Sequence, residues 1–180
     1  IPMIKKFIDK LLGKSTPGTS GGKPHFGKRE EVPASVHGIN PELVDRRAAD
    51  VVHTLKDAGF EAYIVGGAVR DLLLGLRPKD FDVATNATPE QVKGLFRRAF
   101  IIGKRFRIVH VVHGRGREHE VIEVSTFRAY LDNSAAGQVS GNEKTSKAQL
   151  SGMQHAVDAS GRVLRDNVWG PQDEDATRRD

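Results

Sequence analysis

The sequence has no cysteine and no long apolar run, and each absence removes a class of protein. Without cysteine the chain cannot hold disulfides, zinc-finger-type sites or a thiol nucleophile. No stretch approaches the roughly 18 consecutive apolar residues of a transmembrane helix. A Walker phosphate loop, a Gly-x-Ser-x-Gly elbow and paired metal-binding histidines are also missing, so we expect structural or solvated roles for the histidines. The lack of cysteine fits a reducing, cytoplasmic location, which is our expectation.

The 180 residues contain enough apolar side chains for one folded domain, together with an excess of positive charge. The net charge is +5, and residues 91–117 contain eight Lys or Arg and no Asp or Glu. This segment is either an ordinary solvated face or a nucleic-acid surface, and the interleaved Phe96, Phe100 and Phe106 favour the second interpretation. The charge balance therefore favours a polyanionic partner.

Residues 1–38 are predicted to form a flexible basic arm outside the folded domain. Within them, residues 3–12 place apolar side chains at helical spacing between lysines, which predicts a short amphipathic helix. Residues 15–27 have the Gly, Ser, Thr and Pro content of a linker. We expect at most weak contact of residues 3–12 with an anionic membrane surface or a protein partner.

The folded domain is expected over residues 39–180. Its patterns predict helices over 40–59, 69–74, 88–98 and from 171 onward, and strands over 62–65, 81–84, 105–112 and 119–127. The last two strands are joined by a short turn, so they should pair antiparallel. Residues 131–161 are polar and are predicted to form a long loop.

Asp80 and Asp82 are the first candidate metal ligands. In a strand, residues two apart point to the same side, about 7 Å from each other. Two such carboxylates can hold hard cations such as Mg²⁺, and two divalent ions can clamp both oxygens of a phosphoryl transfer. The alternative is a pair of surface aspartates in a turn.

A glycine pair after the first predicted strand is the second candidate feature. Gly66 and Gly67 open a helix that continues with Arg70 and Asp71. Glycines there let backbone N–H groups approach a phosphate, and Arg70 adds a charge-assisted contact. The alternative is a tight strand-to-helix turn with ordinary surface charges.

Glu123 lies in an otherwise apolar predicted strand. A carboxylate with such neighbours is costly to bury unless it binds a cation or hydrogen-bond donors, so Glu123 can complete a metal site with Asp80 and Asp82. The alternatives are a half-exposed glutamate on an edge strand, or Glu120 as the functional carboxylate.

The acidic and basic run over residues 173–180 is the last candidate feature. Its early carboxylates complement the dipole of a predicted helix, which is a purely local explanation. Alternatively, Arg178, Arg179 and Asp180 hold a sugar and a triphosphate.

The order of these pieces resembles the head of class II template-independent nucleotidyltransferases, a family that contains tRNA CCA-adding enzymes and bacterial poly(A) polymerases. The motifs that carry the resemblance are Tyr63-Ile64-Val65-Gly66-Gly67-x-Val69-Arg70-Asp71, Lys79-Asp80-Phe81-Asp82, Glu123-Val124-Ser125-Thr126-Phe127-Arg128 and Arg178-Arg179-Asp180. The resemblance covers roughly residues 40–180. The resemblance implies an α+β, polymerase-beta-like head, with a small mixed or mainly antiparallel sheet flanked by helices.

The resemblance also implies roles for these residues in adding AMP from ATP to RNA 3′ ends. Asp80, Asp82 and Glu123 would bind two Mg²⁺ ions. Gly66, Gly67, Arg70 and Asp71 would lie at the triphosphate. Arg178, Arg179 and Asp180 would contact the nucleotide and support the catalytic carboxylates.

The segment from Ile101 to Val111 is similar to the signature that separates bacterial poly(A) polymerases from CCA-adding enzymes. It carries Lys104, Arg105 and Arg107, which we expect to contact RNA. The prediction is therefore a poly(A) polymerase. A CCA-adding enzyme and a nucleotide- or RNA-binding module without turnover are the alternatives.

In this family the chain continues after the Arg-Arg-Asp motif into neck, body and tail regions, and the neck selects the incoming base. These regions are missing from the 180 residues. We therefore expect weak ATP–Mg²⁺ binding and little RNA extension by this chain alone.

Overall fold

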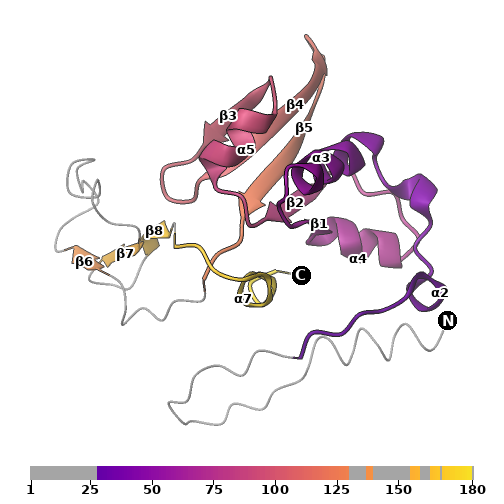
Figure 1. Cartoon of the computed structure of the whole chain (residues 1–180), viewed down its shortest axis with the longest axis horizontal. Helices are drawn as coiled ribbons and strands as arrows, with labels where there is room; N and C mark the ends of the chain where they lie inside the picture. Colours follow the sequence, from indigo (N-terminus) through magenta and orange to yellow (C-terminus); the bar gives the residue numbers. More distant parts are fainter. Residues whose placement is uncertain (1–27, 130–136, 140–154, 159–162, 167, 180) are drawn as a thin grey trace.

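The computed structural model describes residues 28–129, 137–139, 155–158, 163–166 and 168–179 (Figure 1). Its helices are α2 (Ala34–His37), the 3₁₀ helix η1 (Pro41–Leu43), α3 (Arg46–Asp57), α4 (Gly67–Leu73), α5 (Pro89–Leu95) and α7 (Gln172–Ala176). Its strands are β1 (Ala62–Val65), β2 (Asp82–Thr85), β3 (Ala99–Ile102), β4 (Ile108–Arg115), β5 (Glu118–Thr126), β6 (Gly137–Val139), β7 (His155–Asp158) and β8 (Val163–Asp166). The predicted amphipathic helix over residues 3–12 lies outside the described residues.

The main sheet has five strands in the order β1-β2-β5-β4-β3. Strands β2 and β5 are parallel, and every other neighbouring pair in this sheet is antiparallel. The predicted antiparallel pairing of β4 with β5 is confirmed, with their turn at Gly116 and Arg117. The fold is α+β with a mixed sheet, as expected.

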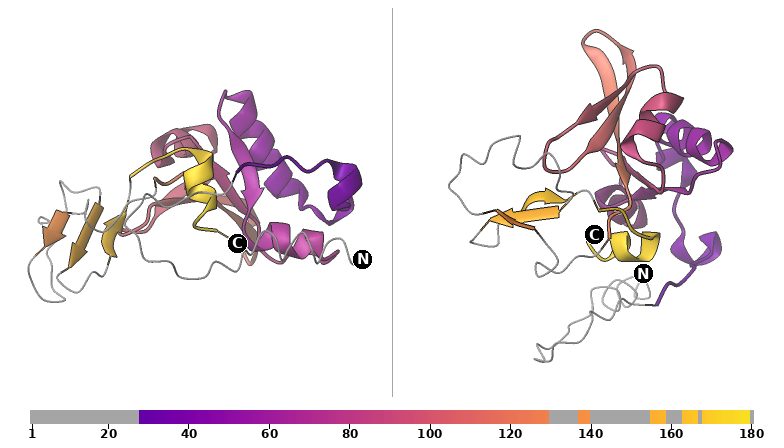
Figure 2. Two further views of the ribbon diagram at one scale, coloured as in Figure 1. Left: turned by 90° about the horizontal axis from the view of Figure 1, so that it is seen from below. Right: turned by 60° about the vertical axis from the view of Figure 1, so that its left-hand side comes forward.

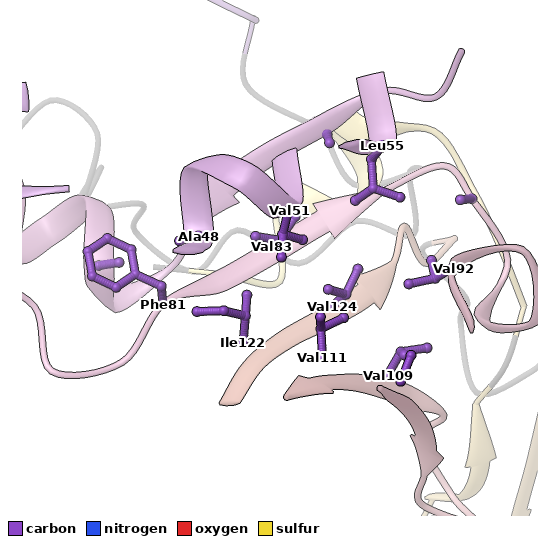
Figure 3. Packing of buried hydrophobic residues seen from close by; sticks show 14 of the residues in the cluster. Ala48, Val51, Leu55, Phe81, Val83, Val92, Val109, Val111, Ile122 and Val124 are labelled. Carbon is purple, nitrogen blue, oxygen red and sulfur yellow. The ribbon is translucent and has the colours of Figure 1, made fainter. Parts of the chain in front are cut away.

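Helices α3 and α5 cover one face of this sheet (Figures 1 and 2). Figure 3 shows Val51 and Leu55 of α3 packed over Val83 and Val124 of the central strands. All four side chains are essentially inaccessible to solvent. Burying apolar area of this kind is the main source of stability of the domain.

The opposite face of the sheet carries the site and is called here the pocket face. Side chains alternate along each strand, so the neighbours of the buried valines point to this second face. The side chains of the pocket face that matter below are Asp82, Ala84, Phe100, Ile108, His110, Glu123 and Ser125.

Side-chain caps explain where helices α5 and α3 begin. The start of α5 agrees with the sequence prediction, and the start of α3 does not. Thr88 and Gln91 form a complete capping box at α5, as the sequence predicts. The single helix predicted over residues 40–59 is wrong, because Asn40 caps only the short η1. A second cap, Asp45, accepts a hydrogen bond from the backbone N–H of Arg47 and starts α3.

Two other segments differ from prediction. Strand β3 was not predicted. It pairs with β4 and forms one edge of the sheet, and the local sequence pattern does not indicate this pairing. The loop predicted over residues 131–161 is wrong in part, because β6 and β7 fall inside it and form a second sheet with β8. The predicted helix at the end of the chain is confirmed as α7.

The segment before α7 pairs with the end of β5. The Ala129 N–H donates to the Val168 carbonyl, the Gly170 N–H donates to the Phe127 carbonyl, and Arg128 and Trp169 form an isolated β-bridge. This pairing holds α7 at the pocket face. Among the described residues, no helix combines the length and apolar character needed to cross a membrane.

Candidate active site

A row of polar side chains crosses three adjacent strands of the pocket face. Asp82, the first residue of β2, is in register with Glu123 of β5, and Glu123 is in register with His110 of β4. The His110 Nε2 atom lies 3.3 Å from a carboxylate oxygen of Glu123. The parallel β2–β5 pairing therefore brings together two carboxylates that are 41 positions apart in the chain.

Asp82 is the most perturbed carboxylate of this row. Burial raises the pKa of the Asp82 carboxyl above its ordinary value, and the negative charge of Glu123 raises it further. The positive charge of Arg179 opposes this shift, and Asp80 adds a smaller upward contribution. The carboxylates of Glu123 and Asp80 thus disfavour the charged form of Asp82, and a cation bound beside Asp82 would relieve this repulsion.

Asp80 occupies a different position from the one the spacing predicts. Strand β2 begins at Asp82, so Asp80 precedes the strand and its side chain is exposed. Phe81 between them is buried in the core. The two aspartates therefore do not share a strand, although their charges remain coupled.

A cavity of about 340 Å³ opens over the row. Carboxylates and arginines line this cavity together with a small apolar patch. The lining residues are Asp82, Phe106, Ile108, Glu123, Ser125, Arg128, Asp175, Arg178 and Arg179. Cationic groups that suit phosphates and anionic groups that suit cations thus face one space.

Asp175 organises the arginine side of the cavity. Its side chain is 4% exposed, and its carboxylate accepts hydrogen bonds from the Arg128 backbone N–H at 2.9 Å and from Arg179 Nε at 2.7 Å. Arg179 Nη2 in turn donates to the Ser125 hydroxyl at 2.7 Å. This network joins α7 to β5, so Arg179 is held in place by α7 and the sheet together.

The remaining residues of the predicted triphosphate site lie around this centre. Arg178 is exposed and donates to the Ala129 carbonyl, and Asp180 lies outside the described residues. Gly66 precedes α4 with φ 71° and ψ −143°, a conformation that only glycine adopts readily, and an added Cβ would lie 3.6 Å from an Asp82 carboxylate oxygen. The glycine turn therefore adjoins the carboxylate row.

Arg70 and Asp71 lie on α4 behind this turn. The Arg70 Nε atom donates to the Asp71 carboxylate at 3.2 Å, and Arg70 folds back so that a Cβ on Gly67 would lie 3.2 Å from its guanidinium. Neither residue lines the cavity. In this arrangement they form a pair beside the glycine turn.

The predicted RNA-binding residues occupy the loop between β3 and β4. Lys104 is exposed, Arg105 is half-buried, and Arg107 forms an ion pair with Glu90 at the start of α5. Arg107 thereby lowers the pKa of the Glu90 carboxyl. Lys104 is thus accessible to a ligand, whereas Arg107 also ties the loop to α5.

The donor set fits Mg²⁺ bound together with a phosphate. Within the described ranges, no three His, Asp or Glu side chains gather into a ready-made metal site. Mg²⁺ does not require one, because it commonly binds one or two carboxylates, several waters and substrate phosphates. The coupled carboxylates of Asp82 and Glu123 provide such hard oxygen ligands.

Several site residues were missed by the sequence interpretation. Ser125, Arg128 and Asp175 line the cavity, and His110 contacts Glu123. Ser125 and Arg128 lie within a motif that the resemblance uses, so that motif was a usable signal. The buried position of Asp175 had no such signal, because it depends on how α7 folds back onto the sheet.

Comparison with known proteins agrees with this geometry. A family model described as the poly A polymerase head domain matches residues 62–180. Poly(A) polymerase I of Salmonella typhi is 45% identical over 179 residues, which are 98% of this chain and 34% of that protein. The CCA-adding enzyme of Bacillus pumilus is 38% identical over 130 residues, covering 70% of this chain and 32% of the enzyme.

A solved structure, the Bacillus stearothermophilus CCA-adding enzyme in complex with CTP, is 40% identical with a TM-score of 0.43, covering 50% of this chain and 21% of that one. The mixed sheet and the family match define a nucleotidyltransferase head. The chain belongs to the poly A polymerase head-domain family. It spans about a third of the length of the curated relatives it matches.

Proposed function

We propose that the cavity is a site of AMP transfer from ATP to the 3′ end of RNA. The observation that carries this proposal is that the neighbouring carboxylates of Asp82 and Glu123 line one cavity together with two arginines, Arg178 and Arg179. Identity of 45% to a protein named poly(A) polymerase I supports the choice of ATP and RNA as substrates.

In this reaction the 3′-hydroxyl oxygen of the RNA forms a bond to the α-phosphorus of ATP. The bond from that phosphorus to the bridging oxygen breaks, and pyrophosphate leaves. Arg178 and Arg179 bind the triphosphate, and the backbone of Gly66 and Gly67 allows its close approach. Glu123 helps to activate the attacking hydroxyl. Charge stabilisation and positioning account for most of the rate enhancement in this chemistry.

Asp80, Asp82 and Glu123 would hold the two Mg²⁺ ions that this class of reaction uses. When bound, the ions neutralise charge on the attacking and leaving oxygens. The charge coupling that raises the pKa of Asp82 supports this assignment. Lys104 and Arg105 would contact the RNA backbone near the cavity, and Arg107 would hold their loop.

An RNA-extension assay tests the function. It uses labelled ATP, Mg²⁺ and an unstructured RNA, with this chain and the longest natural polypeptide that contains it. We expect AMP addition by the longer polypeptide, with little extension by the 180 residues alone. Efficient CTP addition to tRNA lacking its 3′ end, without AMP addition to other RNAs, would contradict the proposal.

That outcome would favour a CCA-adding enzyme, the second candidate, to which the 38% identity to the Bacillus pumilus enzyme points. A third candidate is nucleotide binding without turnover. It is considered because the chain spans only 34% of the length of the poly(A) polymerase I that it matches. Extension of RNA by any polypeptide containing the chain would dismiss it. A cytoplasmic location stays a prediction, as does weak contact of residues 3–12 with a membrane surface or protein.

A further inference from the structure

The cavity contains an aromatic side chain that the proposed chemistry does not use. Phe106 is the single aromatic residue among the described residues that line the cavity. The guanidinium of Arg128 lies over its ring, 4.6 Å from the ring centroid. Phe106 is half-buried, so part of its surface remains accessible.

Both members of this stack are fixed by separate parts of the fold. Gly103 adopts φ 92°, and a Cβ there would collide with the Phe106 carbonyl oxygen, so the loop from β3 to β4 closes tightly around Phe106. On the other side, the buried carboxylate of Asp175 accepts a hydrogen bond from the Arg128 backbone. The backbone is therefore anchored at both members of the stack.

The surroundings of the stack select a flat, uncharged group attached to phosphate. The carboxylates of Asp82 and Glu123 suit a cation, and the arginines suit phosphates, whereas Phe106 and Ile108 form the apolar part of the wall. A ring stacked on an aromatic or guanidinium plane is the usual partner of such a patch in nucleic-acid-binding proteins. A volume of about 340 Å³ lies within the range of small-molecule pockets.

We propose that the Phe106–Arg128 stack is a nucleobase-binding platform of this cavity. The inference rests on the proposed function, because it takes the triphosphate and the RNA end as the ligands of the same space. The base comes either from the incoming nucleotide or from the 3′-terminal residue of the RNA. Stacking binds any base, so this platform contributes affinity and placement without base selectivity.

The experiment uses two fluorescent probes whose emission is quenched when their base stacks. One probe is 2-aminopurine riboside triphosphate, and the other is a short RNA with 2-aminopurine at its 3′ end. Each is titrated with the 180-residue chain in Mg²⁺ buffer. Tripolyphosphate with Mg²⁺ is the control ligand, because it has phosphates but no base. Its binding is measured by calorimetry.

Three variants separate stacking from folding. Phe106→Leu removes the ring and keeps an apolar side chain, whereas Phe106→Tyr keeps the ring. Phe100→Leu is the matched control, because Phe100 is an exposed phenylalanine of the pocket face that does not line the cavity. Circular dichroism verifies that each variant is folded.

We expect Phe106→Leu to weaken one probe by about 5- to 150-fold and to abolish its quenching. Phe106→Tyr and Phe100→Leu should retain quenching, and tripolyphosphate should bind all four proteins equally. The probe that loses affinity identifies the source of the base. If Phe106→Leu does not fold, quenching in the wild-type chain remains the test, and its absence at saturation with both probes would overturn the platform.

Two other results are informative. Equal affinity of both probes for wild type and Phe106→Leu, or an equal loss of tripolyphosphate binding, would also overturn the platform while leaving the proposed function intact. By contrast, a wild-type chain that binds neither tripolyphosphate nor either probe would contradict the proposed function itself.

Discussion

The two faces of the five-stranded sheet are built for different tasks. The face under α3 and α5 carries aliphatic side chains from every strand, all of them buried or nearly so. The pocket face, from the same strands, carries Asp82, Glu123 and His110, with Phe100 and Ile102 exposed beyond them. Side chains alternate between the two faces along each strand. A shift of a strand's pairing register by one residue would therefore exchange its buried aliphatic side chains with its pocket-face side chains.

The comparison shows where stability and chemistry are separated in this fold. Substitutions on the covered face should change the free energy of unfolding, whereas substitutions on the pocket face should change ligand binding and catalysis. Asp175 is the exception, because it is the one charged side chain among the described residues that is buried.

Asp82→Ala should lower AMP transfer by about 10³-fold or more, because it removes a carboxylate at the centre of the site. The melting temperature should not fall, since the change also removes a charge whose burial and repulsion by Glu123 outweigh its attraction to Arg179. RNA extension and thermal denaturation, measured on the longest natural polypeptide that contains the chain, check both parts. Near-normal extension would remove Asp82 from the mechanism.

Leu55→Ala should destabilise the domain by about 2–5 kcal/mol, because it leaves a cavity under α3. Leu74→Ala is the matched control, since Leu74 is 56% exposed and should lose little stability. Urea denaturation measures both values. Similar losses for the two variants would contradict the assignment of the core to the α3 face.

Asp175→Asn should affect both stability and binding. The neutral amide weakens the charge-assisted hydrogen bond from Arg179, at a cost of about 1–3 kcal/mol, and frees Arg179 to leave the cavity. ATP–Mg²⁺ affinity should therefore fall together with the melting temperature. Asp173→Asn, at an exposed position of the same helix, should change both quantities much less.

Asp45→Ala should have the smallest effect, about 1 kcal/mol, because it removes the α3 cap. The hydrogen bond and charge of Arg47 lower the pKa of Asp45, although burial opposes them. A lowered folded-state pKa gives stability that is present above the unfolded pKa and is lost as pH falls through the folded one. The stability difference between wild type and variant should therefore shrink below about pH 4, and a constant difference would contradict this account.

Local features of the fold were predictable, and contacts between distant segments were not. The capping box of Thr88 and Gln91, and strand β1, follow from neighbouring residues alone. The edge strand β3 and the second sheet depend on pairing with remote segments. The helix predicted from Asn40 was wrong because two caps, Asn40 and Asp45, lie five positions apart and the second one starts α3.

In the candidate site, too, features carried by neighbouring residues were predictable and contacts between distant segments were not. Asp82 and Glu123 were identified by their unusual neighbours in sequence, and the register of β2 with β5 places them together. The spacing argument treated Asp80 and Asp82 as residues of one strand that point to the same side, yet the strand begins only at Asp82. His110 and Asp175 reach the site only through β4 pairing and the return of α7, and sequence spacing does not encode either.

The most direct test of the account is calorimetric titration of ATP into the 180-residue chain with and without Mg²⁺. We expect binding that requires Mg²⁺ and is lost in both Asp82→Ala and Arg179→Ala, while circular dichroism shows that both variants are folded. Binding should be unchanged in Leu74→Ala. Equal affinity for wild type and the two site variants, or binding that does not depend on Mg²⁺, would contradict the claim that the carboxylates and arginines of the pocket face form one nucleotide site.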